Sequence, residues 1–374
     1  MLHVDIPTRT DIVDLARHRD PMSVSLFLPT TPVTPNADAD RILFKNLARE
    51  ALDQLAPETS EEKRRFRDLA EELDDLIEDD DFWRLGANGL AVFATPENLR
   101  TFRVPTTFTP GAHASDRFHL KPLLRATTFC NACHVLALAD GSVRLVEVSA
   151  GLPAVVVKVP GMPESAADAV GKASIADRTV AGSLSGSTGK NLRLRQYARK
   201  VDAALRNVLA GSDLPLLLAA VDRLDAIYRS VNTYPHLAAR SLEGGRERMS
   251  EAELAAAARP LLDEIYAARL AEWRDTFAQR ERAGRTTTDV AHAARAATFG
   301  VVQSMLVDID TAAPGTIDET TGAIAFEEHA SSSNFGLVDE IARRALLGGA
   351  DVLAVRADAI PGGRPLAAIL RYAF

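Results

Sequence analysis

The chain of 374 residues is long enough for two or three domains, and its composition, 47% hydrophobic and 25% charged, is typical of a globular protein. A formal net charge of −8 argues against a protein that coats nucleic acid with its whole surface, so a polyanion would have to meet a local basic patch. Two cysteines argue against a disulfide scaffold and fit a reducing compartment. The N-terminal stretch "MLHVDIPTRTDIVDLARHRD" has no apolar core of signal-peptide length, and no segment approaches a membrane span. We therefore expect a cytoplasmic protein without a membrane partner.

The first part of the chain predicts a small α/β unit. "VSLFLPT" (24–30) alternates apolar residues and predicts a strand, and helical spacing follows over 39–55 and 60–77. We expect Ser60 to cap the second helix, without a full capping box because Lys63 stands where a glutamate is needed. "NGLAVFAT" and "LRTFRVP" then predict a pair of strands.

The pattern starts again after "DRFHLKPLL" (116–124). "CHVLALADGSVRLVEVSAG" predicts a β-hairpin, because two alternating runs flank the turn "ADGS". A polar region, 171–190, leads into a basic helix, and "LPLLLAAV" (214–221) predicts a buried strand. Residues 250–282 are strongly helical in composition.

The last part predicts a third α/β unit. It opens with "GRTTTDVAHAARAATFG", where a threonine is available as the helix cap. Strands "VQSMLVDI", "DVLAVRA" and "AAILRYA" alternate with the helix "LVDEIARRALLGG", which indicates a small α/β sandwich.

Two short motifs resemble a nucleotide-binding loop and a haem- or metal-binding site, but neither has all the residues that such a site requires. In "SGSTGKNLRLRQYARK" (185–200) the pair "GK" resembles a phosphate-binding loop, but the upstream glycine falls on Leu184 and Asn191 replaces the required Ser or Thr. "CNACH" (130–134) matches a haem-attachment pattern, but it runs into an alternating strand and no second cysteine pair could complete a zinc site. We predict two buried thiols there, and no metal or other cofactor.

The basic helix after the Gly/Ser-rich loop gives the clearest binding signal. Its apolar residues form one stripe, namely Leu194, Tyr197, Ala198, Val201, Leu205 and Val208. Arg195, Arg199 and Arg206 lie together on roughly the opposite face, with Arg193 and Lys200 on a flank. Either this is a solvated face with Asp202 pairing to Arg199 or Arg206, or it contacts a phosphate backbone.

A second candidate surface is the probable loop "YRSVNTYPHL" (228–237). Tyr228, Asn232, Tyr234 and His236 could stack on bases or contact a partner, because loops carry function disproportionately. Aromatic anchors that only close a domain explain the same residues.

The order of these blocks resembles the archaeo-eukaryotic class-1 release factor and Pelota superfamily, and specifically its bacterial branch, family 3 of the bacterial archaeo-eukaryotic release factors (baeRF). The blocks are "VSLFLPT" with "NGLAVFAT", then "DRFHLKPLL", then "LRLRQYARKVDAALRNVLAGSDLPLLLAAV", and finally "LVDEIARRALLGGADVLAV" with "ILRY". The resemblance implies three α/β domains. These are a release-factor-like N-terminal domain (1–115), a ribonuclease-H-like middle domain (116–284), and a C-terminal domain like kink-turn-binding ribosomal proteins (285–374).

The same resemblance explains the Gly/Ser-rich loop. In release factors the loop before the basic helix carries Gly-Gly-Gln, which places a water on the peptidyl-tRNA ester. Here the region reads "VAGSLSGSTGKN", and no Gly-Gly-Gln occurs anywhere in the chain. Six residues would keep it flexible and let it order on binding: Gly182, Ser185, Gly186, Ser187, Thr188 and Gly189. We expect no catalytic residue here.

The sequence therefore predicts a ribosome-associated relative of release factors that acts in hibernation, stress protection or rescue without releasing peptide. The residues expected to contact ribosomal RNA are Lys190, Arg193, Arg195, Arg199, Lys200 and Arg206. A translational GTPase is a candidate second partner, and DNA is not expected. Two alternatives remain open. One is a hydrolase acting on peptidyl-tRNA or another ester through the 182–190 loop or His236, and the other is a stress module that binds a protein or small ligand away from the ribosome.

Overall fold

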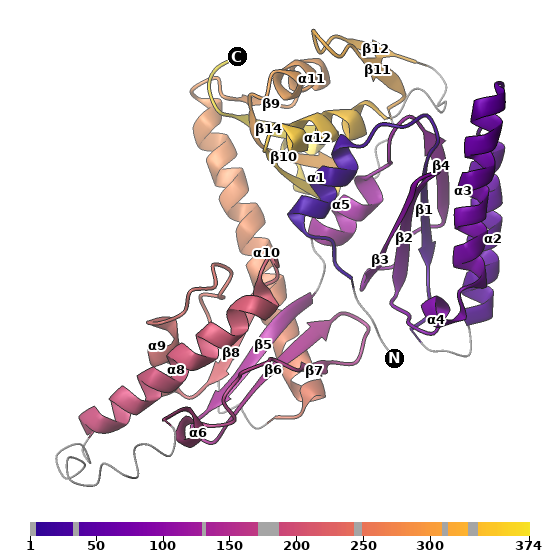
Figure 1. The fold of residues 1–374 in the computed structure, drawn as a ribbon. Coiled ribbons are helices and arrows are strands. Elements are labelled where there is room, and N and C mark those ends of the chain that lie inside the picture. The colour runs from indigo at the N-terminus through magenta and orange to yellow at the C-terminus, as the bar shows by residue number, and fades with distance from the viewer. Residues whose placement is uncertain are drawn as a thin grey trace. The chain divides into compact units, whose positions relative to one another are not determined.

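The computed structural model describes residues 5–32, 37–128, 132–170, 187–242, 249–308, 313–327 and 336–374. The chain forms two compact units, one made of Met1–Cys130 with Ala268–Phe374 and the other of Asn131–Ala267 (Figure 1). Both contain helices and sheets, so the predicted mixed α/β class is confirmed. The division into domains 1–115, 116–284 and 285–374 stays a prediction.

The N-terminal sheet of the first unit is antiparallel, in the order β3-β2-β1-β4. Its strands are β1 (Ser23–Pro29), β2 (Gly89–Thr95), β3 (Asn98–Val104) and β4 (Gly111–Ser115). Val24, Leu26 and Leu28 of β1 pack against helices α2 (Ala37–Asp53) and α3 (Ser60–Glu78), while Phe27 belongs to a second core on the other face. Because successive side chains of a strand point to opposite faces of the sheet, the alternate residues of β1 belong to two different cores.

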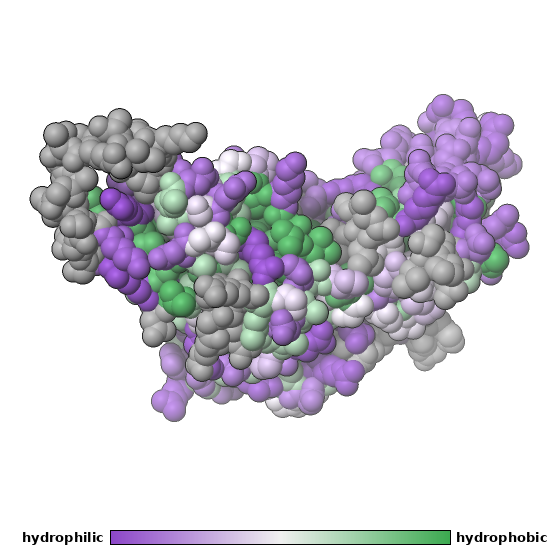
Figure 2. All heavy atoms as spheres, turned by 90° about the horizontal axis from the view of Figure 1, so that it is seen from below, coloured by the Kyte–Doolittle hydropathy of each residue, from purple (hydrophilic) through white to green (hydrophobic). Residues whose placement is uncertain are grey.

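Helix α3 begins one residue earlier than a Ser60 cap would allow. Its cap is Thr59, whose hydroxyl accepts the backbone N–H of Glu62 at 3.1 Å, while the Glu62 carboxylate accepts the Thr59 N–H at 2.9 Å. This is a full capping box, so the expected cap was wrong by one position. Hydrophilic side chains cover the α2–α3 pair, at the right of Figure 2, as expected for helices with one buried face.

The C-terminal sheet of the same unit has the order β13-β10-β14-β9, with β10 parallel to β13 and antiparallel to β14. Helix α11 is capped by Asp289, whose carboxylate accepts the N–H of His292, and not by the threonine expected from the sequence. Bounds of its elements are β9 (Thr286–Thr287), α11 (Val290–Thr298), β10 (Val302–Asp308), α12 (Leu337–Leu347), β13 (Asp351–Val355) and β14 (Leu366–Leu370). A hairpin, β11 (Gly315–Ile317) with β12 (Ile324–Phe326), and two 3-10 turns, Ala357–Ala359 and Pro361–Gly363, complete it.

The two sheets of this unit share one core. Phe27, Phe93 and Phe102 from the N-terminal sheet belong to the same buried cluster as Met305 and Ile341 from the C-terminal one. Between them lie α1 (Arg9–Arg17) and α5 (Lys121–Thr128), with the short α4 (Asp80–Trp83) at the edge of the N-terminal part (Figure 1). The first and last parts of the chain are therefore one cooperative body.

The second unit is built on a mixed sheet in the order β7-β6-β5-β8, in which β8 runs parallel to β5. Both faces of this sheet are covered, because Leu136 and Leu138 of β5 pack with α8 and α9, while Val135 and Ala137 pack with α10. Bounds are β5 (Ala132–Ala139), β6 (Ser142–Ser149), β7 (Val155–Val157), α6 (Ala166–Val170), α8 (Ser187–Leu209), β8 (Leu216–Ala220), α9 (Asp222–Arg229) and α10 (Glu251–Glu281). The predicted hairpin, buried strand and long helix are all present.

Across these described ranges no helix is long and apolar enough to cross a membrane.

Candidate nucleic-acid interface

Helix α8 is held to the sheet by the apolar stripe that its sequence predicts. Leu194, Tyr197, Ala198, Val201 and Leu205 are buried, and Val208 is partly buried. The Tyr197 hydroxyl lies 3.1 Å from the carbonyl oxygen of Ala139 and 3.2 Å from that of Ser142. Burial, with a further contribution from the charge of Asp140, raises the pKa of this phenol, so it remains a neutral donor. The helix is therefore fixed in rotation about its axis.

The opposite side of α8 carries the cations. Arg193, Arg195, Arg199 and Lys200 are exposed, and none of them has an ion pair within the described part of the chain. Two further cations are partnered: Lys190 lies 3.4 Å from the carboxylate of Asp140, and Arg206 lies 3.1 Å from that of Asp202. The sequence had left open which arginine Asp202 meets, and it is Arg206.

Asp202 is unavailable to the other cations because it is only 3% exposed. Its carboxylate accepts the backbone N–H of Thr233 at 2.8 Å and the Thr233 hydroxyl, in addition to Arg206. It therefore joins α8 to the segment that follows α9. Ion pairs within the helix therefore account for Arg206 but not for the other arginines of the basic face.

Four unpaired cations on one helix oppose its stability. Arg195 and Arg199 stand at i and i+4, where like charges destabilise an isolated helix by about 0.2–0.5 kcal/mol. An arginine also offers five N–H donors in a fork that matches phosphate oxygens, and these side chains have no such partner among the described residues. The arrangement can bind a polyanion along the helix.

The Gly/Ser-rich loop lies only partly within the described residues. Gly182, Ser185 and Gly186 lie outside them, whereas Ser187, Thr188 and Gly189 form the first turn of α8. The helix thus starts inside the stretch that the sequence assigned to a loop.

The second candidate surface, residues 228–237, is mostly used inside the unit. Tyr228 lies at the end of α9 and is fully buried, so its ring is not free to stack on a base. The Tyr234 hydroxyl lies 2.7 Å from the carbonyl oxygen of Leu214, and the Asn232 side chain donates to the Tyr234 carbonyl at 2.8 Å. His236 is the accessible member, at 3.3 Å from the carboxylate of Asp213. These side chains close the unit, which was the alternative that the sequence left open.

The backbone after this loop runs along the outer edge of the sheet. The N–H of Leu216 donates to the carbonyl of His236, and the N–H groups of Ala238 and Leu242 donate to carbonyls of β8. The free edge of β8 is thereby covered, which sequence periodicity gave no reason to expect.

The "CNACH" motif has a structural role where it is described. Cys133 is buried in β5, and His134 is 7% exposed, with burial lowering its pKa to about 4. Cys130 lies outside the described residues. Within those residues no three His, Cys, Asp or Glu side chains gather as metal ligands.

The chain is similar to solved structures of translation factors at low identity. An archaeal translation termination factor, aRF1, is 15% identical, covering 98% of this chain and 99% of that one, with a TM-score of 0.23. Archaeal Pelota, from a model of ribosome-bound Pelota and ABCE1, is 12% identical over 99% and 95%, with a TM-score of 0.39. Dom34 of S. cerevisiae, described as a termination-like factor in RNA quality control that interacts with Hbs1, is 9% identical over 99% and 94%, with a TM-score of 0.43. No curated protein matches the chain.

The family model of bacterial archaeo-eukaryotic release factor family 11 matches residues 130–268. These residues coincide with the second compact unit, so the match includes β5–β8, α8 and the first half of α10. The sequence resemblance suggested family 3, whereas the family model that matches these residues is that of family 11. Residues 130–268 of this chain, close to the extent of the second unit, are therefore similar to the bacterial archaeo-eukaryotic release factors, the group that the sequence resemblance indicated.

Proposed function

We propose that this protein is a ribosome-associated translation factor whose helix α8 contacts ribosomal RNA. The observation that carries the proposal is the set of four exposed cations, Arg193, Arg195, Arg199 and Lys200, without ion pairs among the described residues. They stand on a helix whose other face is locked into the family domain. The rigid helix fixes the Cα positions of these residues, which suits a phosphate backbone of defined shape, and the guanidinium fork matches phosphate oxygens.

The local charge also fits the acidic composition of the whole chain. A net charge of −8 disfavours indiscriminate binding to nucleic acid, while a confined basic face still attracts phosphates within about a Debye length, 8 Å at physiological salt. A large structured RNA such as that of the ribosome offers phosphates to such a face.

Peptide release is not part of the proposal. Release factors rely on Gly-Gly-Gln to orient the attacking water, and this chain contains no such triplet. We propose a role in hibernation, stress protection or rescue, in the cytoplasm. A translational GTPase as second partner stays a prediction of the resemblance.

The test is sedimentation of the purified protein with 70S ribosomes at low and moderate salt. Arg195→Glu/Arg199→Glu is expected to abolish co-sedimentation, because it reverses two phosphate-facing charges while leaving the buried stripe intact. The matched control is Arg259→Glu/Arg282→Glu, which changes the net charge by the same amount at two other exposed positions. Normal binding by the α8 variant, or equal loss in the control, would contradict the assignment. Hydrolysis of peptidyl-tRNA by the wild-type protein would favour the hydrolase alternative.

A further inference from the structure

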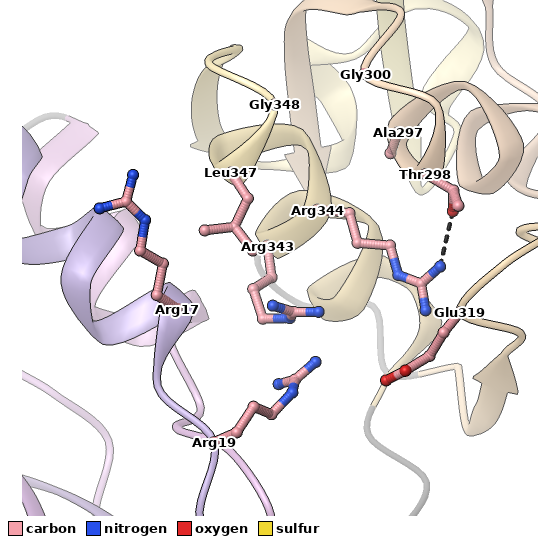
Figure 3. A pocket seen from close by; sticks show the side chains of 10 residues that line it. All are labelled: Arg17, Arg19, Ala297, Thr298, Gly300, Glu319, Arg343, Arg344, Leu347 and Gly348. Carbon is pink, nitrogen blue, oxygen red and sulfur yellow. Dashed lines mark hydrogen bonds between the residues drawn. The ribbon is translucent and has the colours of Figure 1, made fainter.

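A hollow of about 510 Å³ opens in the first compact unit, between the end of α1, the ends of α11 and α12, and the turn of the β11–β12 hairpin (Figure 3). Its volume falls in the range of small-molecule sites. Four of the residues that line it are arginines, Arg17, Arg19, Arg343 and Arg344, and the one acid among them is Glu319. None of these residues belongs to the basic face of α8.

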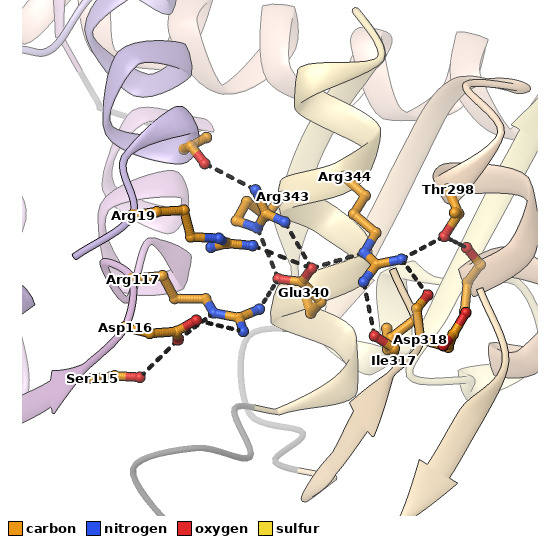
Figure 4. A network of polar contacts seen from close by, with 12 residues as sticks. Arg19, Ser115, Asp116, Arg117, Thr298, Ile317, Asp318, Glu340, Arg343 and Arg344 are labelled. Atoms are coloured by element: carbon orange, nitrogen blue, oxygen red, sulfur yellow. Dashed lines mark hydrogen bonds and ion pairs between the residues drawn. The ribbon is translucent and has the colours of Figure 1, made fainter. Parts of the chain in front are cut away.

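Beside the hollow, one buried carboxylate serves several guanidinium groups. Glu340 is 5% exposed and has ion contacts with Arg19, Arg117, Arg343 and Arg344 (Figure 4). Its Oε1 accepts from Arg343 and Arg344, and its Oε2 accepts from Arg117 and Arg343. A carboxylate offers about four lone-pair positions, so these hydrogen bonds use all of them.

Arg19 is the one of these four arginines that donates no hydrogen bond to Glu340 among the described residues. Its closest carboxylate oxygen is Oε1 of Glu340, at 3.8 Å, and it makes no hydrogen bond within the part of the chain that the structure describes. Figure 3 shows its guanidinium facing that of Arg343 across the hollow. Burial, and then the charges of Arg343 and Arg117, lower the pKa of Arg19 against the opposing charges of Glu340 and Asp116. The lining of the hollow itself carries four arginines against one acid, Glu319.

The position of Arg19 is nevertheless fixed. His18 stacks on Phe118 with ring centroids 4.6 Å apart, and the N–H of Asp20 donates to the carbonyl of Asp116 at 3.0 Å. The backbone on both sides of Arg19 is therefore anchored, and its side chain lines the hollow, about one third exposed. The anchored backbone keeps the guanidinium within reach of a ligand in the hollow.

The negative ends of nearby helices explain why Arg343 and Arg344 lie here, but they do not explain Arg19. The C-termini of α1, α11 and α12 carry partial negative charge, which attracts cations. Arg343 donates to the carbonyl of Ala16, and Arg344 donates to the carbonyls of Ile317 and Asp318 and to the Thr298 hydroxyl. Arg19 donates to none of these groups. Arg343 keeps two of its five N–H donors outside the hydrogen bonds given above.

We propose that this hollow binds a small ligand through a phosphate or diphosphate group, with Arg19 and Arg343 donating to the phosphate oxygens. Arg17, 68% exposed and 3.6 Å from Asp14, lies on the rim and can turn to the same group. A dianion would neutralise the excess charge and use the free N–H groups in the paired geometry that guanidinium favours. The site is independent of ribosome binding by α8.

The test is calorimetric titration of the full chain with inorganic pyrophosphate, orthophosphate and ADP in phosphate-free buffer. Pyrophosphate or ADP is expected to bind the wild type, and Arg19→Gln to weaken that binding about tenfold, which is the loss of one hydrogen bond to a charged group. Arg19→Lys, which keeps the charge but not the fork, is expected to lie between them. Arg84→Gln, which removes an exposed arginine elsewhere in the same unit, is the matched control and is expected to bind like wild type. Tighter binding of ADP than of pyrophosphate would identify a nucleotide, and the reverse would identify a free polyphosphate.

Absence of binding by all three probes, or unchanged affinity in Arg19→Gln, overturns the proposal. A second outcome also overturns the proposal: pyrophosphate does not bind, but a short RNA does, and Arg19→Gln weakens the binding of that RNA. The hollow would then be a contact site for RNA. The same titrations in the Arg195→Glu/Arg199→Glu background separate this site from the proposed function. If the hollow is a separate site, the Arg195→Glu/Arg199→Glu variant loses ribosome binding but binds pyrophosphate with the affinity of the wild type.

Discussion

Replacing Glu340 by glutamine is the sharpest test of the charge arrangement around the hollow. Glutamine has nearly the shape of a protonated glutamate, so the variant removes the negative charge and keeps the packing. Burial alone would raise the pKa of Glu340, but hydrogen bonds and charges from Arg343, with those of Arg117 and Arg344, outweigh it and lower the pKa to about 2. The carboxylate is therefore strongly preferred in the folded state.

The magnitude follows from the pKa difference between the folded and unfolded states. A fall from the ordinary value of 4.5 to about 2 corresponds to about 3 kcal/mol of stability at pH 7. Because the pKa is lower in the folded state, this stabilisation is present above pH 4.5 and is lost as the pH falls towards 2. At pH 3 we expect about 1.5 kcal/mol to remain. The loss at neutral pH agrees with the usual cost of breaking a buried ion pair from one side, about 3–5 kcal/mol.

Tryptophan fluorescence makes the assay specific to one unit. The chain has two tryptophans, Trp83 and Trp273, and both lie in the first compact unit together with Glu340. Urea unfolding of wild type and Glu340→Gln, followed by this fluorescence at pH 7 and pH 3, therefore reports the right transition. Glu319→Gln, on the exposed hairpin turn, is the matched control and is expected to cost less than about 0.5 kcal/mol. If Glu340→Gln lowers the free energy of unfolding by less than about 1 kcal/mol at pH 7, or by the same amount at pH 3, the charge of Glu340 does not stabilise the first unit in the way described.

Three further predictions concern other polar groups. Neutralising two phosphate-facing charges with Arg195→Gln/Arg199→Gln should reduce the slope of log affinity for ribosomes against log salt by about 1.5, measured by sedimentation; an unchanged slope would contradict phosphate contact. Asp339 is half-buried, but its Oδ1 is buried without a hydrogen bond in the described structure, and desolvation raises the pKa of this carboxyl group to about 6, so its ionisation destabilises the fold as the pH rises through 6. Asp339→Asn should stabilise the first unit by about 3 kcal/mol at pH 8 and by almost nothing below pH 4, and equal effects at both pH values would exclude the titration. Tyr197→Phe should cost about 1–2 kcal/mol because the single hydroxyl proton that the carbonyls of Ala139 and Ser142 share is lost, whereas Tyr228→Phe should be neutral or stabilising because the Tyr228 hydroxyl has no hydrogen bond in the described structure. Melting of the two variants, followed by circular dichroism, checks this difference, and equal losses would argue against it.

Local pattern was enough to predict most of the elements. The apolar stripe of α8 follows the helical period and is largely buried, and the continuously apolar run 214–221 contains the fully buried strand Leu216–Ala220. The cap of α3 was visible in the sequence but was placed one residue too late. Thr59 and Glu62 have the spacing of a capping box, whereas Ser60 has Lys63 at the corresponding position.

The charged cluster could not have been found in this way. Arg19, Arg117 and Glu340 are separated by about 100 to 320 residues, and none stands in a recognisable motif. The sequence did suggest that Arg206 or Arg199 would meet Asp202, because helical spacing limits the choice to two. It could not show that Thr233 would bury that carboxylate and so leave the remaining cations of α8 unpaired.

The shared core of the first unit has a consequence for how the protein is made on the ribosome. Phe27, Phe93 and Phe102 are synthesised early, but Met305, Ile341 and the central strand β14, which complete the same unit, follow roughly 200 residues or more later. At about 5–20 residues per second, the aromatic face of the nascent N-terminal sheet waits about 10–50 seconds for its partners. During that interval the second unit, which is continuous in the chain, can already fold on its own contacts. The nascent chain thus exposes an apolar surface that favours aggregation unless a chaperone covers it, and truncations within the last hundred residues should be insoluble although they retain residues 130–268, which the family model matches.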